Sequence, residues 1–124
     1  MTNAAVGVFR RLVNATRNSI NGLGAGLRTQ PALRYEFYIL AIALPAAWLL
    51  GNGAVERALM ISSCLLVVVV ELLNSAIEVV VDRIGSEHHE LSGRAKDLAS
   101  SAVLFSIILA VTVWAILLGD RWLR

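Results

Sequence analysis

One stretch of the chain, residues 67–82 (VVVVELLNSAIEVVVD), alternates apolar and polar positions at the spacing of an α-helix. Its polar residues Glu71, Asn74, Glu78 and Asp82 follow one another at intervals of three, four and four. At about 100° per residue they fall within a stripe about 80° wide, which we call the polar stripe. The opposite face is apolar: Val69, Leu73, Ala76 and Val80. The pattern predicts a helix whose outer face meets lipid or protein and whose inner face gathers carboxylates that need a proton or a cation.

Three long apolar segments predict membrane-spanning helices, at about residues 37–55, 58–82 and 98–119. Each is close to or above the ~20 residues that cross a hydrocarbon core. We expect Pro45 to kink the first. Short polar links at 51–57 and 83–97 join the segments, and Ser92 is a candidate N-cap for the third helix.

The residues before the first span, at about 6–30, show a different periodicity. Apolar residues recur at helical spacing, and arginines and asparagines occupy the other side. This pattern predicts an amphipathic helix on a membrane surface, although a surface helix of a soluble bundle would share it. We expect the closely spaced glycines Gly22, Gly24 and Gly26 to break or tighten this helix before the chain enters the bilayer.

Composition supports a membrane protein of one domain, residues 1–124. Hydrophobic residues make up 57% of the chain and charged residues 16%, which is too apolar for an ordinary soluble domain of this length. The net charge of +2 is too small to indicate a nucleic-acid partner. The single cysteine, Cys64, lies in an apolar run and is interpreted as a packing residue.

Basic residues predict the orientation. With three spans, the N-terminal segment and the 83–97 link share one side, which holds eight of the eleven lysines and arginines. The other side holds Arg57, Arg121 and Arg124. Positive residues favour the cytoplasmic side, so we expect a cytoplasmic N-terminus.

The 83–97 link (RIGSEHHELSGRAKD) is dense with functional groups. Its Glu-His-His-Glu run lacks the spacing of a zinc protease site, so we do not predict zinc there. Asp97, Ser100 and Ser101 start a polar edge on the third span, which we expect to face Glu71 and Asn74 across a helix pair.

Residues 71–83 (ELLNSAIEVVVDR) and 84–97 (IGSEHHELSGRAKD) together resemble the signature of the prokaryotic diacylglycerol kinases. The resemblance covers nearly the whole chain. It implies an all-α membrane protein with a surface helix and three transmembrane helices, assembled as a homotrimer in the bacterial inner membrane with sites between chains. It also implies transfer of the γ-phosphoryl group of ATP, with Mg²⁺ as cofactor, to diacylglycerol, which gives phosphatidic acid.

The resemblance assigns roles to individual residues. Glu71 would be the general base, and Asn74 would orient Glu71 or the acceptor. Lys96 would meet the phosphate chain, and Asp97 would position Lys96 or the metal shell. The other nucleotide positions are Arg11, Asn18, Gln30, Glu78, Glu87, His88 and His89. The lipid positions are Arg11, Arg34, Glu36, Glu71 and Ser100, and the metal positions are Glu78 and Gln30.

The chain departs from the family pattern at two of these positions. Gln30 stands where the family usually has a metal-ligating glutamate, and its amide oxygen can bind Mg²⁺ only without charge. Either Mg²⁺ binds more weakly, or another carboxylate such as Glu36 or Asp97 substitutes. Asn18 stands where a tyrosine is common. Two other functions stay open: an undecaprenol kinase of the same architecture, and a small transporter or proton relay that uses Glu71 as its intramembrane carboxylate.

Overall fold

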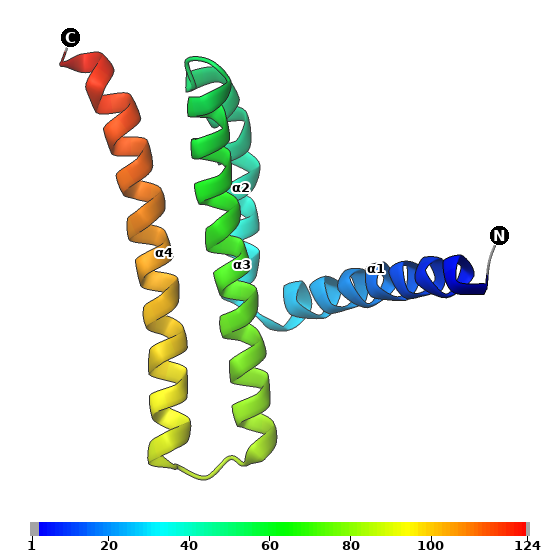
Figure 1. The fold of residues 1–124 in the computed structure, drawn as a ribbon. Coiled ribbons are helices and arrows are strands. Elements are labelled where there is room, and N and C mark those ends of the chain that lie inside the picture. The colour runs from blue at the N-terminus through cyan, green and yellow to red at the C-terminus, as the bar shows by residue number, and fades with distance from the viewer. Residues whose placement is uncertain (1–2, 124) are drawn as a thin grey trace. The chain divides into compact units, whose positions relative to one another are not determined.

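The computed structural model describes residues 3–123, and Arg124 lies outside them. The described residues form four helices, and the chain separates into two compact units that meet between Pro31 and Ala32. The first unit holds α1 (Asn3–Thr29). The second holds α2 (Pro31–Leu50) from its second residue onward, α3 (Ala54–Ile84) and α4 (Glu90–Trp122) (Figure 1). We describe each unit separately.

The described part of the first unit is one continuous helix as far as Thr29, α1. The prediction that the three glycines interrupt it is wrong, because helical hydrogen bonding runs through all of them to Thr29. Glycine lowers helix propensity by about 1 kcal/mol relative to alanine but does not forbid a helix. The break comes instead at Gln30, whose N–H donates to the Gly26 carbonyl at 2.8 Å, just before Pro31. Proline is favoured in the first turn of a helix, and α2 begins there.

The second unit contains three helices long and apolar enough to cross a membrane, of 20, 31 and 33 residues. They confirm the three predicted apolar segments, although α2 lies several residues earlier than predicted, and α3 and α4 extend at both ends. α2 continues as a helix through Pro45. At 1.5 Å per residue α3 and α4 are roughly 45–50 Å long, so each exceeds a hydrocarbon core of about 30 Å by several turns.

A tight turn reverses the chain between α2 and α3. Gly53, the N-cap of α3, has a φ of 95°, a conformation that side chains disfavour. The Asn52 N–H donates to Glu56 Oε2 at 2.8 Å, which satisfies a backbone donor at the start of α3. The guanidinium of Arg57 lies 4.7 Å from the centre of the Trp48 ring, and its Nε donates to the Gly51 carbonyl.

α3 and α4 pack along each other in the second unit, as Figure 1 shows. Two side-chain contacts join them away from the 85–89 link. Arg121 forms an ion pair with Glu56, and Trp114 Nε1 donates to the Met60 carbonyl at 3.3 Å. Met60 is fully buried.

The start of α4 differs from the prediction. The helix begins at Glu90, and His89 is its N-cap, with its Nδ1 accepting from the Leu91 N–H at 3.1 Å. Ser92 therefore lies inside the first turn and is not the cap. Only residues 85–89 remain as a link between α3 and α4, much less than the 83–97 span of the predicted link.

Candidate active site

The polar stripe of α3 points into the second unit, as predicted. Glu71 and Asn74 are buried, at 4% and 8% exposure, Glu78 is half-buried, and Asp82 at the end of the helix is exposed. The opposite face is exposed, with Val69, Leu73 and Val80 all more than half accessible. The carboxylates of α3 thus lie along a single face, and their exposure increases from Glu71 to Asp82.

Polar atoms along the buried part of this face lack partners. Asn74 Oδ1, Ser75 Oγ and Glu36 Oε2 are buried without a hydrogen-bond partner among the described residues. Asn74 Nδ2 approaches Glu78 Oε1 at 3.5 Å, a long contact. A buried polar atom without a partner costs free energy, so these groups are suited to bind a ligand. The Glu36 and Glu71 carboxylates also repel each other, and a donor or a cation between them would relieve that repulsion.

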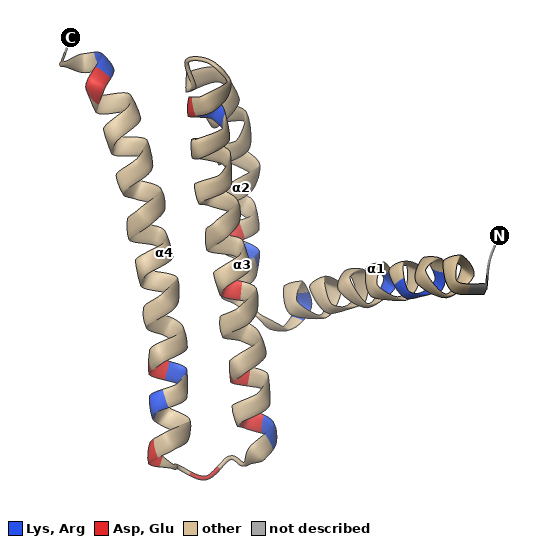
Figure 2. Cartoon of the chain, in the orientation of Figure 1, with Lys and Arg blue, Asp and Glu red and all other residues tan. Residues whose placement is uncertain are grey.

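The exposed end of the stripe borders a polar cavity of about 260 Å³, which we call the loop cavity. Its lining comes from the end of α3, the link and the start of α4: Val81, Asp82, Gly85, Ser86, Glu87, His88, His89, Ser92, Gly93 and Lys96. Lys96 Nζ lies 2.7 Å from Asp82 Oδ1 across this cavity. Figure 2 shows that acidic and basic residues gather at this end of α3 and α4, whereas most of α4 beyond it carries no charge.

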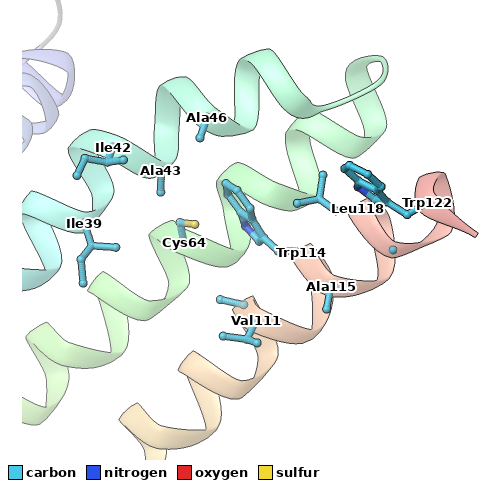
Figure 3. Close-up of a pocket in the computed structure, with 12 residues that line it drawn as sticks. Ile39, Ile42, Ala43, Ala46, Cys64, Val111, Trp114, Ala115, Leu118 and Trp122 are labelled. Carbon is cyan, nitrogen blue, oxygen red and sulfur yellow. The ribbon is translucent and has the colours of Figure 1, made fainter.

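Two apolar hollows lie between α2, α3 and α4. The larger, of about 730 Å³, is shown in Figure 3, where Trp114 from α4 extends beside Cys64 of α3. The smaller, of about 230 Å³, shares Ile39, Ala43 and Cys64 with it and reaches Glu36. Together they form a continuous apolar lining that ends at a carboxylate near Glu71, which suits an acyl chain with a polar end.

The other predicted site residues belong to the first unit or are exposed in the second. Arg11, Asn18 and Gln30 belong to the first unit. In the second unit Arg34 and Asp97 are exposed. The expected polar edge of α4 does not face Glu71 and Asn74, because Ser100 and Ser101 are exposed and Ala99 and Ser106 are the buried positions. The small side chain of Ala99 takes the position in the helix contact that the polar edge was expected to occupy.

Sequence reasoning gave no role to Asp82, although it counted that residue in the stripe. The contact with Lys96 joins residues 14 apart on two helices. The sequence gives one indication of this contact: Asp82 lies near the end of α3 and Lys96 near the start of α4, on either side of a short link. Among the described residues, no three histidine, cysteine or acidic side chains cluster as a ready-made metal site.

The sequence is similar to known proteins over most of its length. The profile of the prokaryotic diacylglycerol kinases matches residues 17–118. The chain is 52% identical to the diacylglycerol kinase of Escherichia coli (strain K12) over 98% of this chain and 99% of that protein. It is 48% identical to the diacylglycerol kinase of Haemophilus influenzae over 83% and 87% of the two chains. Identity to that of Pseudomonas aeruginosa is 45% over 90% and 91%. The chain therefore belongs to the prokaryotic diacylglycerol kinase family.

Proposed function

We propose that this protein transfers the γ-phosphoryl group of MgATP to the primary hydroxyl of diacylglycerol and releases phosphatidic acid and ADP. The observation that carries the proposal is the course of the polar stripe. One helix face runs from the buried Glu71, beside an apolar hollow, to Asp82 at a polar cavity that holds Lys96. Such a face can bring a lipid hydroxyl and a water-soluble nucleotide to opposite ends of one site.

Glu71 acts at the lipid end. The acceptor oxygen forms a bond to the γ-phosphorus while the bond from that phosphorus to the bridging oxygen of ADP breaks, and the hydroxyl proton passes to the Glu71 carboxylate. Asn74 lies one turn further along the same face, where its unpartnered Oδ1 is available to the acceptor. Arg34, Glu36 and Ser100, with Arg11 from the first unit, complete the proposed lipid contacts.

The loop cavity binds the nucleotide in this proposal. Lys96 supplies a positive charge for the phosphate chain, with Asp97 beside it in sequence. Glu87, His88 and His89 line the same cavity and provide donors and acceptors for the nucleoside. Arg11, Asn18 and Gln30 join the nucleotide from the first unit.

The donor set fits magnesium. Mg²⁺ prefers oxygen ligands and is commonly held by one or two carboxylates together with substrate phosphates and water, so a cluster of three acidic residues is not required. Glu78 would hold it from α3, and Gln30 would add an uncharged oxygen. When bound, the ion neutralises charge on the β- and γ-phosphates.

The assembly and its surroundings are also part of the proposal. The helices α2, α3 and α4 expose many large apolar side chains, among them Ile42, Leu49 and Phe105. Lipid or a second copy of the chain would cover them. We propose a homotrimer with sites between chains, in the bacterial inner membrane, with α1 on the cytoplasmic surface. In this orientation the 85–89 link faces the cytoplasm, where ATP is found.

The test is phosphate transfer from γ-labelled MgATP in mixed micelles, with diacylglycerol and undecaprenol offered separately. Labelled phosphatidic acid as the main product is expected. Labelled undecaprenyl phosphate as the main product would change the acceptor and keep the phosphoryl transfer. No labelled lipid from a folded protein, together with no Mg²⁺-dependent binding of nucleotide, would overturn the kinase function and favour a transporter.

A further inference from the structure

The contact between Lys96 and Asp82 is more than a surface ion pair. It joins α3 and α4 beside the loop cavity, and both residues line that cavity. The side chains are 41% and 68% exposed, and ion pairs this accessible contribute little to stability because solvent screens them. The contribution of this ion pair to the stability of the fold is therefore small. Its effect is to fix the position of the Lys96 ammonium.

A second carboxylate lies close to Asp82 on the polar stripe. Glu78 is one helical turn before Asp82 on the same face of α3, about 6 Å along the helix axis. Lys96 is the only lysine of the chain, and its four-carbon stem lets the ammonium move over such a distance. The polar stripe thus places a second carboxylate one helical turn from the partner of Lys96, outside the lining of the loop cavity.

We propose that Asp82 is a positioning residue, which holds Lys96 beside the loop cavity until the phosphate chain of the nucleotide replaces Asp82 as its partner. The inference rests on the proposed function, because it assumes a nucleotide in that cavity. Phosphate oxygens and the Asp82 carboxylate compete for the same donors, and the polyphosphate carries the larger negative charge. Lys96 then turns from Asp82 toward Glu78, where the proposed metal and the γ-phosphate meet.

The first experiment tests the contact and its exchange without measuring activity. A water-soluble carbodiimide activates a carboxylate, and an amine in contact with it then forms an amide, with net loss of one water. In the full chain in micelles, Lys96 and the N-terminal amine are the available amines. We expect peptide mapping to find an Asp82–Lys96 amide, and a non-hydrolysable ATP analogue with Mg²⁺ to suppress it. Absence of this amide, or an amide yield that saturating nucleotide leaves unchanged, would refute the proposal.

The second experiment separates positioning from structure by kinetics. Asp82→Asn is expected to lower kcat/KM for ATP by roughly ten- to a hundredfold, the usual range for a lost charge-assisted contact, and Asp82→Glu to recover most of it. In the double variant with Lys96→Met, the loss should match that of Lys96→Met alone, because both changes remove one interaction. Additive losses would refute the proposal.

The chain offers a matched control in Glu90, which forms an exposed ion pair with Arg94 at 3.0 Å within α4. Glu90→Gln should leave kcat/KM within about twofold, as for most exposed pairs. A loss of kcat/KM equal to that of Asp82→Asn would refute a specific role of Asp82. It would mean that any lost charge near the 85–89 link has the same effect. Failure of the proposed function is a separate outcome: the unchanged protein would make no phosphorylated lipid, while the amide would still form without nucleotide.

Discussion

Replacing Glu71 by glutamine tests the proposed chemistry most directly. The two side chains have the same shape, so the change removes the basic oxygen and leaves the packing of a 4%-exposed position. General base catalysis commonly contributes 10²–10⁴-fold, and burial keeps water from replacing the lost base. We therefore expect kcat to fall by roughly 10²–10⁴-fold.

Nucleotide binding should survive the same change. Glu71 lies seven residues before Glu78 and eleven before Asp82, which is about 10 Å and 16 Å along the helix axis. The loop cavity is therefore remote from the altered group. The assay is phosphatidic acid formation in micelles, paired with Mg²⁺-dependent binding of an ATP analogue, and Glu90→Gln serves as the control. Turnover that stays within about tenfold would refute the base role, and lost nucleotide binding would make Glu71 a ligand or structural group.

Other changes test the metal site and the turn at the opposite end. Glu78→Gln should raise the half-saturating Mg²⁺ concentration at least about tenfold, since even outer-shell partners commonly matter that much, and an unchanged Mg²⁺ titration would exclude a metal role. Gln30→Glu should lower the Mg²⁺ requirement by adding a charged oxygen; an unchanged requirement would place this residue away from the metal. Gly51→Ala should destabilise the fold by about 1–3 kcal/mol in thermal unfolding, because a Cβ there would lie 2.5 Å from Arg57 Cγ and 2.7 Å from a backbone oxygen. Gly119→Ala, where nothing lies within 4 Å, is its control and should not lower the unfolding temperature.

The helices and the buried stripe could be predicted from the sequence because periodicity depends on local geometry. Residues at intervals of three and four must share a face, so Glu71 and Asn74 were expected on one side of α3 and are buried together there. The apolar lengths were equally informative, since each span needs a minimum number of residues.

Helix ends and contacts between helices were less predictable. Ser92 is a common N-cap residue, but the imidazole of His89 takes that role three residues earlier. Glycines that weaken a helix still lie within α1, because neighbouring residues sustain its hydrogen bonds. The pairing of Lys96 with Asp82 depends on the crossing of two helices, which no periodicity within either one encodes.

The ties between α3 and α4 limit how this part of the protein can move. The two helices are joined by the 85–89 link and Lys96–Asp82 at one end, by Arg121–Glu56 at the other and by Trp114–Met60 between. These contacts at both ends and in the middle oppose separation of the two helices. α2 contacts α3 mainly at the turn, where Arg57 binds the Gly51 carbonyl and lies over the Trp48 ring. Both apolar hollows lie along α2, and the smaller one reaches Glu36. An apolar molecule can therefore approach Glu36 from this side without separating α3 from α4.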